Sequence, residues 1–580
     1  MPKIKFKNCD CTVIPGRFHI NNIPMNCPAA LKLISSGKTI GIFQLETQLG
    51  QDWAKRVKPD SIEELANLTA LLRPGGLESG MSQEYIDVKF GKKETLYLHP
   101  ALKPILESTY GALIFEEQAI RIAVEIGGLT LENGDQLRKA IAKKKPELMS
   151  KMKRIFIDGA KQKGLVSEEN AIEIFGWIEK AQRYSFNKSH SRAYGELSYQ
   201  TSWLKCHFPL EFFASYLNYS AYKGDPKEEI YQLVQDARFF GIVVLPPDIK
   251  EKNIDFKINK EFKQIRFGLG HIKGVGKTAV DKILTNCVSS LNTWKDFLIA
   301  IPSLHKDVGI ALIKAGACDS YGFSRNNMVL QLETIFGTTT RDENGQKKEI
   351  KGLTPRERDY LLNKLSHQTQ MKQILLDMIN YNPPKINQIK KTELIKIIEE
   401  YFNGAINPTK MKKQEIIDII KNEGIFGDDT IPKITEARRT ILREKTALLE
   451  QDIVDTNTAK AMAEKHFLGI ALSCSAADDT NKNGATHTCL ELAKSLDINE
   501  AVLCCVIENV KHIKTKRGDN PGQPMCFLTL SDSTYAINTA VVFPNVYKNL
   551  KGLCKEDFVC MFSGYKKNGS FVIQDIQKLI

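Results

Sequence analysis

The spacing of apolar residues changes along this chain, and that change constrains its fold most strongly. Over residues 29–220 apolar residues recur at three- and four-residue intervals, as in SIEELANLTALL (61–72) and ENAIEIFGWIEKAQ (169–182). This is the period of amphipathic helices packed on a core. Over residues 500–580 the composition shifts to Val, Ile, Phe, Cys and Thr, broken by turn glycines. That shift favours short strands closed into a small barrel.

We therefore expect a multidomain protein that is mainly helical and ends in a β-barrel resembling an OB-fold. A length of 580 residues accommodates about three to five domains. The expected parts are an irregular segment 1–28, a helical domain 29–220, a mixed domain 221–325 with strands at IDFKI and QIRFGLG, a Lys-rich helical region 326–465, a linker 466–499 and the barrel 500–580. In the Lys-rich region, residues 391–404 and 412–424 resemble each other and indicate a weak internal duplication.

The charge of the chain suits a polyanionic partner. The sequence has 81 Lys and Arg against 68 Asp and Glu, a formal charge of +13. Phosphate contacts made by such side chains release counterions from nucleic acid. A merely Lys-rich, solvated surface explains the same charge equally well. No apolar run of 18 residues and no signal-peptide pattern occur, so we expect a cytoplasmic protein without a membrane span.

The thirteen cysteines are dispersed, which indicates reduced thiols rather than a disulfide framework. One local group, Cys9, Cys11, His19 and Cys27, offers four zinc-ligand types. Its C-x-C spacing is not a common zinc pattern, and no second C-x2-C pair follows. We therefore expect no bound metal from these residues and favour free thiols.

Two basic clusters could bind phosphate. The first contains five cations in DQLRKAIAKKKPE: Arg138, Lys139, Lys143, Lys144 and Lys145. On a helix these like charges repel one another unless an anion neutralises them, although an isolated basic run is usually a solvated face. The second cluster is Asn187, Lys188, Ser189 and His190 in YSFNKSHSRAY. It combines a cation with hydrogen-bond donors, but an ordinary helix N-terminus with an Asn or Ser cap explains it too.

A glycine hairpin follows in GLGHIKGVGKTAVDKIL. Lys273, Gly274, Val275, Gly276 and Lys277 would connect an apolar helix end to a new helix, which is a helix-hairpin-helix pattern. Glycines let the backbone approach a DNA phosphate without reading the base sequence. An ordinary turn between two helices is the alternative. A phosphate loop is excluded, because His271 stands where its first glycine is required.

The barrel region carries basic and aromatic side chains suited to single-stranded nucleic acid. Its first hairpin contains Lys511, Lys514, Lys516 and Arg517, and Phe527, Tyr535 and Phe543 are available for stacking. Phe527 and Phe543 are expected to lie in the core instead, as large aromatic residues usually do.

A series of longer strings resembles the bacterial C-family replicative DNA polymerases. In order, they are GIFQLET (41–47), ALLRPGGLESGM (70–81), STYGALIFEEQ (108–118), DQLRKAIAKKKPE (135–147), YSFNKSHSRAYGELSYQTSWLKCHFPLEFF (184–213), LPPDI (245–249), GLGHIKGVG (268–276) and KHFLGIALS (465–473). The resemblance covers about residues 20–320 and 460–580 and leaves 326–460 without a match.

This resemblance implies the fingers, the helix-hairpin-helix domain and the OB-fold domain of a DNA-directed DNA polymerase. It implies that both basic clusters, with Arg73 and Gln118 from other finger strings, meet the phosphates of a nucleotide. The chain departs from the family in having Lys139 where a second Arg is common, Ala142 and Ser185 where Gly is, and Glu116 in place of Gln.

The family's catalytic carboxylates lie in its palm, and no Asp-x-Asp string in a strand context occurs in this sequence. Lys7 stands where the third palm Asp would be. The resemblance therefore implies a split polymerase, inactive alone, whose Mg2+ is held mainly by a second chain carrying palm and thumb. Its other expected partners are primer-template DNA and dNTP, and a sliding clamp is a candidate through QLETIF (331–336). The alternative is a non-catalytic DNA-binding replication accessory protein.

Overall fold

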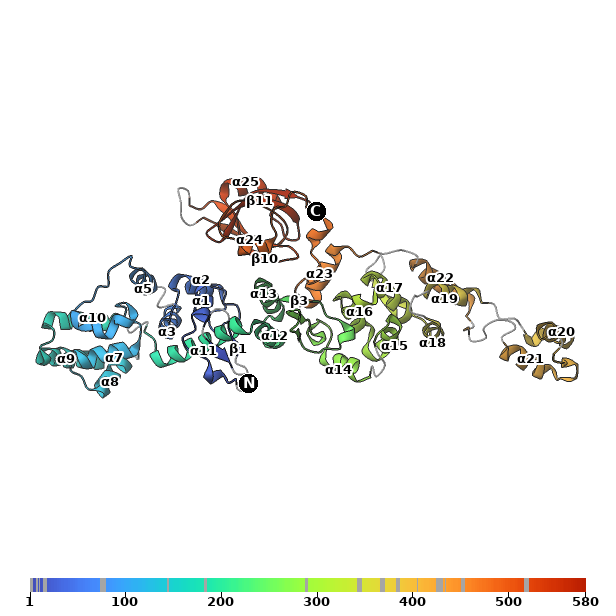
Figure 1. The fold of residues 1–580 in the computed structure, drawn as a ribbon, viewed down its shortest axis with the longest axis horizontal. Coiled ribbons are helices and arrows are strands. Elements are labelled where there is room, and N and C mark those ends of the chain that lie inside the picture. Colours follow the sequence, from blue (N-terminus) through green and yellow to red (C-terminus); the bar gives the residue numbers. More distant parts are fainter. Residues whose placement is uncertain are drawn as a thin grey trace. The chain divides into compact units, whose positions relative to one another are not determined.

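The computed structural model describes the chain apart from short gaps, and its residues form two compact units. The gaps are residues 1–3, 7–8, 10, 14–17, 74–79, 143–145, 182–184, 287–290, 342–346, 366–370, 382–385, 404, 424–430, 433, 450–453, 516–520 and 580. The first unit comprises Met1–Tyr219 and Gln232–Phe240, and the second comprises Ser220–Tyr231 and Gly241–Ile580. Figure 1 shows the elements of both units along the chain.

The first unit is helical apart from a short N-terminal hairpin. Its elements are β1 (Ile4–Lys5), β2 (Thr12–Val13), α1 (Pro28–Ser35), α2 (Gln48–Val57), α3 (Ile62–Leu71), α5 (Met81–Lys89), α6 (Lys103–Leu106), α7 (Glu116–Glu125), α8 (Leu131–Ala142), α9 (Pro146–Lys163), α10 (Glu168–Ala181), α11 (Lys188–His207) and α12 (Pro209–Tyr219). Two hydrophobic cores stabilise it, one around α1–α3 and α11 and one around α6–α10.

Small residues on one face of α11 explain why this helix packs so closely on its neighbours. Ser191, Gly195, Ser198 and Ser202 recur at three- and four-residue spacing and are buried. A Cβ on Gly195 would lie 3.2 Å from the Ala66 backbone nitrogen of α3. The three serine hydroxyls donate hydrogen bonds to backbone carbonyls of Ala66, Phe43 and Ala30. These contacts fix α11 against α3, α1 and the GIFQLET loop.

The second unit begins with a three-stranded sheet and continues into helices. The sheet order is β3 (Val243–Leu245), β5 (Gln264–Arg266), β4 (Lys257–Asn259). The other elements before the barrel are α14 (Lys277–Asn286), α15 (Trp294–Leu304), α16 (Lys306–Lys314), α17 (Arg325–Phe336), β6 (Gly337–Arg341), β7 (Lys347–Lys351), α18 (Pro355–Lys364), α19 (Met371–Asn380), α20 (Lys391–Tyr401), α21 (Lys413–Asn422), α22 (Glu436–Leu448), α23 (Asn457–Leu468) and α24 (Cys489–Lys494). Helix α13 (Pro226–Phe239) is divided between the two units.

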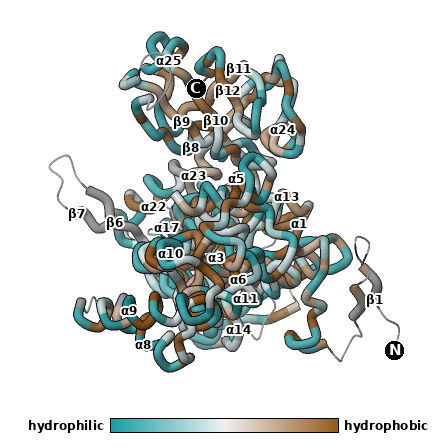
Figure 2. The backbone as a smooth tube through the Cα atoms, turned by 90° about the vertical axis from the view of Figure 1, so that its left-hand side faces the viewer, coloured by the Kyte–Doolittle hydropathy of each residue, from teal (hydrophilic) through white to brown (hydrophobic). Residues whose placement is uncertain are grey.

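The C-terminal part is a closed five-stranded barrel. Its strand order is β10 (Ala536–Val542), β12 (Ser570–Lys578), β11 (Val559–Lys567), β8 (Ile498–Lys514), β9 (Pro524–Ser531), and β9 pairs back with β10. Helix α25 (Pro544–Leu550) connects β10 to β11. In Figure 2 hydrophobic and hydrophilic segments alternate along helices and strands, as expected for elements buried on one side.

The structure confirms the predicted fold class: a mainly helical multidomain chain that ends in a β-barrel. Three local expectations were wrong. Region 326–465 contains the β6–β7 hairpin, because Gly337, with φ at +82°, ends α17 before a run of β-branched threonines. The expected linker 466–499 contains α24. The segment before the G-V-G hairpin is a 3-10 turn, Leu269–His271, rather than the end of an α-helix. Among the described residues, no helix is long and apolar enough to cross a membrane.

Candidate functional site

One residue of the first basic cluster and two of the second meet at adjacent carboxylates, Glu116 and Glu117, in the first turn of α7. Arg138 on α8 donates from Nη1 to Glu116 Oε2 at 3.3 Å. From α11, Asn187 Nδ2 and the Lys188 backbone N–H donate to the two Glu117 oxygens at 2.9 and 2.8 Å. Residues about fifty positions apart in the sequence therefore border one site.

Backbone contacts hold these carboxylates in place. Phe115 and Phe186 form a parallel β-bridge, in which Glu116 N–H donates to the Phe186 carbonyl at 3.0 Å. Asn187 then caps α11, because its Oδ1 accepts from the His190 N–H at 2.8 Å. The helix N-terminus thus begins beside the acidic start of α7. The alternative interpretation of Asn187 as a helix cap is therefore correct. The cap also positions Lys188, the first residue of α11, at the site.

The cations of this site are already paired with anions. Arg138 and Lys139 both contact Asp135, at 2.9 and 2.6 Å, and Lys188 Nζ lies 3.3 Å from Glu63 Oε1. Hydrogen bonds from Lys139 and Arg138 hold the pKa of Asp135 below its usual range. The Asp135 carboxylate in turn raises the pKa of Arg138. The side chains remain accessible, at 31% exposure for Arg138 and 42% for Lys188, so a stronger anion can reach them.

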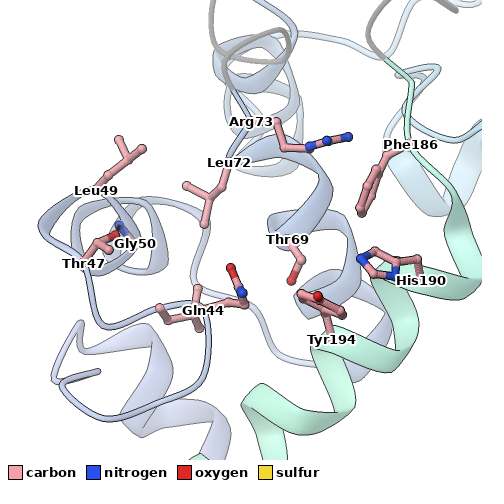
Figure 3. Close-up of a pocket in the computed structure, with 11 residues that line it drawn as sticks. Gln44, Thr47, Leu49, Gly50, Thr69, Leu72, Arg73, Phe186, His190 and Tyr194 are labelled. Carbon is pink, nitrogen blue, oxygen red and sulfur yellow. Dashed lines mark hydrogen bonds between the residues drawn. The ribbon is translucent and has the colours of Figure 1, made fainter. Parts of the chain in front are cut away.

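A pocket of about 360 Å³ lies beside α11 (Figure 3). The Arg73 guanidinium lies over the Phe186 ring, 4.3 Å from its centroid. The His190 and Tyr194 rings are in tilted contact, with 4.1 Å between ring centroids. Gln44, from the GIFQLET loop, also lines the pocket, and its backbone has φ at +64°. Cationic, aromatic and amide groups therefore line one cavity, as in sites that bind planar polar ligands.

The predicted nucleotide-binding residues fall into three groups. Arg73, Arg138, Lys139, Asn187, Lys188 and His190 border the site or the pocket, and Ser189 is exposed in the first turn of α11. Lys143, Lys144 and Lys145 lie outside the described residues. Gln118 is buried at 4% exposure. Its Oε1 accepts from the backbone N–H of Ile114 and Phe115, and its Nε2 donates to Thr109. Gln118 therefore shapes the loop and does not offer its amide to a ligand.

Sequence reasoning missed the acidic residues and two pocket residues. Glu63, Glu117 and Asp135 hold the cations and α11, but they belong to no motif, and Glu63 and Glu117 lie in the first turn of helices, where carboxylates are common. Gln44 and Tyr194 carry no motif of their own. The sequence did hold one signal for them. Gln44 lies inside GIFQLET, and Tyr194 lies inside YSFNKSHSRAY, the string that also contains His190.

The glycine hairpin of the second unit exposes backbone next to lysines. Gly274 has φ at +86°, and Lys273, Gly274 and Gly276 are exposed, while Val275 is buried. A Cβ built on Gly276 would meet no atom within 4 Å, so the space over this residue is open. Lys277 begins α14, and its side chain lies outside the described residues. The open hairpin leads into a helix N-terminus, which favours an anion.

Further cations surround this hairpin. Lys273 Nζ lies 3.4 Å from His466 Nε2, and Lys227 Nζ donates to the His466 carbonyl at 2.6 Å. The charge of Lys273, then burial, then Lys227 and Lys314 lower the pKa of His466. Among the described residues, none of these three lysines forms an ion pair with a carboxylate. Burial and the charge of Lys273 lower the pKa of Lys227 against the opposing effect of Asp225, so positive charge is in excess around the hairpin.

The barrel presents a cation and an aromatic ring on one outer face. Lys511 on β8 lies directly opposite Phe527 on β9, and Lys514 is also exposed. Phe527 is 36% exposed and Phe543 is 43% exposed, so the expectation that both belong to the core was wrong. Strand alternation turns Cys526 and Leu528 inward and leaves Phe527 outside. Lys516 and Arg517 lie outside the described residues.

The candidate clamp-binding peptide QLETIF is part of a buried helix. Gln331 accepts a hydrogen bond from Trp294 Nε1 at 2.7 Å, and Leu332 and Ile335 are at 0% and 1% exposure. These side chains cannot dock into a partner without unfolding α17. The interpretation as a clamp peptide was therefore wrong, and the amphipathic-helix alternative is correct.

Comparison with known proteins identifies two domains of this chain. Residues 10–164 match the bacterial DNA polymerase III alpha subunit finger domain, and residues 241–328 match a helix-hairpin-helix motif. The chain thus combines a polymerase finger domain with a motif of the DNA-binding type.

The relatives are more particular. Over 451 residues the chain is 34% identical to DNA polymerase III subunit alpha of Aquifex aeolicus, which covers 75% of this chain and 38% of that protein. It is 40% identical over 324 residues to the subunit alpha of Pasteurella multocida, covering 54% and 27%. It is 40% identical over 267 residues to that of Escherichia coli K12, covering 45% and 23%. The chain is therefore similar to bacterial DNA polymerase III alpha subunits over a large part of its length, and this part includes its finger and helix-hairpin-helix matches. It spans between 23% and 38% of the length of these three relatives.

Proposed function

We propose that this chain supplies the nucleotide-binding fingers and the DNA-binding domains of a DNA-directed DNA polymerase. The convergence of Arg138 and Lys188 on Glu116 and Glu117 supports this proposal most strongly. Homology to DNA polymerase III alpha subunits supports the same function. An accessory protein that only binds DNA has no need for a preformed cationic site in the fingers.

In the proposed mechanism, the finger cations bind the phosphates of a dNTP. During phosphoryl transfer negative charge moves toward the leaving pyrophosphate, and fixed cations stabilise it. Asp135 and Glu116 hold the Arg138 guanidinium in position before the nucleotide enters. The triphosphate then competes with these carboxylates for the guanidinium. Preorganisation of this kind lowers the cost of ordering a long side chain during binding.

The described carboxylates near this site do not suit Mg2+. Glu116 and Asp135 each contact a cation, and Glu117 accepts hydrogen bonds from amide N–H groups. Among the described residues, the one cluster with metal-ligand geometry consists of thiols and a histidine, which are poor ligands for Mg2+. We therefore place the catalytic Mg2+ on palm carboxylates that lie outside these 580 residues, in a polypeptide that also carries the thumb.

The second unit and the barrel are proposed to hold primer-template DNA. The open glycine hairpin with Lys273 would contact duplex phosphates regardless of sequence. The barrel would act as an OB-fold that binds single-stranded DNA. Lys511 and Lys514 would contact the phosphates of the DNA, and a base would stack on Phe527. We place no sliding-clamp contact, because the QLETIF segment is buried.

Primer extension tests the proposal. The purified chain, with Mg2+, dNTP and primed DNA, is expected to bind DNA without extending the primer. Addition of a palm-bearing polypeptide from the same genome is expected to restore extension. Extension by the chain alone would refute the placement of the metal site. If the palm-bearing polypeptide is fully active without this chain, and adding this chain changes only the affinity for DNA, the accessory function is correct instead.

A further inference from the structure

Three thiols and an imidazole converge in the first unit, away from the finger site. The ligand atoms of Cys9, Cys11, Cys27 and His207 all lie within 4.8 Å of one another. His207 Nε2 is 3.3 Å from Cys27 Sγ and 3.7 Å from Cys9 Sγ. None of the three cysteines is in a disulfide. The four side chains come from three segments of the chain that are up to 198 residues apart.

The local structure brings each ligand to the cluster for an identifiable reason. The β1–β2 hairpin carries Cys9 and Cys11 in its turn region, closed by the hydrogen bond from Phe6 N–H to the Cys11 carbonyl. Cys27 occupies the N-cap of α1. The Tyr199 hydroxyl of α11 accepts from the Cys27 N–H at 2.7 Å and thereby fixes its backbone. His207 is the last residue of the same helix α11.

Aromatic rings pack against the imidazole, and two of the four side chains are buried while Cys9 and His207 are half-buried. The Phe6 ring lies 4.1 Å and the Trp203 ring 4.7 Å from the His207 ring, between centroids. Cys27 is at 1% and Cys11 at 7% exposure. Such an apolar shell is typical of structural metal sites, in which the ligands and not solvent complete the coordination.

The distances from the His207 ring nitrogen to two of the sulfur atoms agree with a tetrahedral zinc site. Zn–S bonds of about 2.3 Å and Zn–N bonds of about 2.0–2.1 Å place neighbouring sulfur and nitrogen ligands about 3.6 Å apart in a tetrahedron. The two distances from His207 Nε2, 3.3 and 3.7 Å, bracket that value. Packing of free thiols explains their burial, but it gives no reason for three sulfur atoms and one ring nitrogen to face a common point.

We propose that Cys9, Cys11, Cys27 and His207 bind one Zn2+ in a closed Cys3His site. Soft thiolates with one imidazole select zinc over Mg2+ or Ca2+, and four protein ligands leave no open position for catalysis. The metal would fasten the N-terminal hairpin to the end of α11. The other end of that helix carries Asn187 and Lys188 of the finger site.

The structure also corrects the sequence-based ligand set. His19 is exposed, and its Nδ1 accepts from the Asn21 N–H at 3.2 Å, so it is not a member of the cluster. His207 takes its place although it lies 180 residues after Cys27. Local spacing could not reveal a fourth ligand at that distance, which is why the short C-x-C pattern alone argued against a metal.

Metal analysis of the purified chain tests the proposal. Protein prepared under reducing conditions without chelators is expected to contain about one zinc per chain by elemental mass spectrometry. Replacement with Co2+ is expected to give the visible absorption of tetrahedral thiolate-bound cobalt. Protein that contains no zinc and takes none up from a zinc buffer would overturn the proposal. So would a disulfide between any two of the three cysteines in the freshly isolated protein.

Two histidine variants provide a matched comparison. His207→Gln is expected to lower zinc content and cobalt absorption severalfold, whereas His19→Gln is expected to leave both unchanged. Equal zinc content in the two variants would contradict the assignment of His207. Cys474→Ser, which removes a half-buried thiol from the second unit, serves as a second control and should retain the metal.

Thiol labelling of the wild-type chain decides the question even if His207→Gln does not fold. Treatment with a chelating metal-indicator dye is expected to remove the zinc, which the colour of the dye reports. The same treatment is expected to expose three more thiols to alkylation. Peptide mapping should place them at Cys9, Cys11 and Cys27. Alkylation at these positions that is equally fast with and without the chelator would overturn the proposal.

Discussion

The finger site of the first unit and the hairpin of the second unit both carry cations, but they differ in whether those cations are paired with carboxylates. In the fingers, Arg138, Lys139 and Lys188 each contact a carboxylate. At the hairpin, Lys273 lies near other lysines and a histidine, and the described part of the chain provides it with no carboxylate partner.

This difference fits two kinds of anion. A small ligand that enters and leaves needs cations held in a fixed geometry, and neighbouring carboxylates provide that geometry at little net charge. A long polyanion gains affinity from unpaired cations, because each phosphate contact releases a counterion. We therefore expect mutations in the fingers to affect nucleotide use and mutations at the hairpin to affect DNA affinity.

The largest expected effect is on nucleotide use. In the enzyme assembled with its palm, Arg138→Ala should lower kcat/KM for dNTP by about 10²-fold, or roughly 2.7 kcal/mol of transition-state stabilisation. Arg138→Lys should recover only part, because Lys cannot make a bidentate contact. The control is Arg121→Ala, which removes an exposed arginine paired with Glu125 on α7. If kcat/KM of Arg138→Ala and of Arg138→Lys equals that of the control Arg121→Ala, Arg138 does not belong to a nucleotide site.

The barrel should contribute next. Phe527→Ala is expected to weaken binding of single-stranded DNA by about tenfold, within the roughly 1–3 kcal/mol that stacking on one base provides. Fluorescence anisotropy with an oligonucleotide measures this. Leu496→Ala, which shortens another exposed apolar side chain, should have no effect. If both variants bind alike, Phe527 is exposed without a role in stacking.

A comparison of variants at Gly276 and Gly274 distinguishes the loss of a DNA contact from backbone strain. Gly276→Val should weaken duplex binding by about fivefold for every sequence tested, because its side chain would occupy the open space through which a phosphate approaches. Gly274→Val adds strain, since φ is +86° there, and should also lower the melting temperature. Unchanged duplex affinity of Gly276→Val, or a loss confined to one sequence, would contradict backbone contact.

A smaller effect of opposite sign is expected from Glu116. Glu116→Gln keeps an acceptor oxygen beside Arg138 but removes the negative charge that competes with the triphosphate for this partly exposed guanidinium, so it should strengthen nucleotide binding two- to threefold, about 0.5 kcal/mol. Glu117→Gln should instead weaken it, because Glu117 accepts from Asn187 and from the Lys188 backbone. Equilibrium dNTP binding to the complex with primed DNA compares the two variants. If the two changes have the same sign, the carboxylates do not have separate roles.

The sequence predicted the elements of these sites better than their arrangement. Helical periodicity located α3 and α10, and the strand-rich composition predicted the barrel. The long-range pairing of Arg138 and Lys188 through Glu116 and Glu117 was not predictable, because it depends on the bridge between Phe115 and Phe186. The family resemblance implied that the two clusters share a pocket, but not which acidic residues join them.

Burial decided the remaining errors. In QLETIF, Gln331, Leu332 and Ile335 lie on the buried face of α17, whereas Phe527 lies on the exposed face of β9, because the period of each element decides which of its residues face the core. A single sequence records which residues are apolar and not which face a neighbouring element covers. Domain bounds at 28, 220, 325, 465 and 499 remain predictions.

The salt dependence of duplex affinity tests the contrast between the two regions most directly, and it uses the chain alone. The slope of log K against log salt concentration is measured for wild type, Lys273→Ala, Arg138→Ala and the control Lys257→Ala, which removes an exposed lysine of β4. Loss of one phosphate contact should reduce the slope of Lys273→Ala by about 0.9. Arg138→Ala and Lys257→Ala should keep the wild-type slope. A reduced slope for Arg138→Ala with an unchanged slope for Lys273→Ala would show that the fingers, and not the hairpin, contact the duplex.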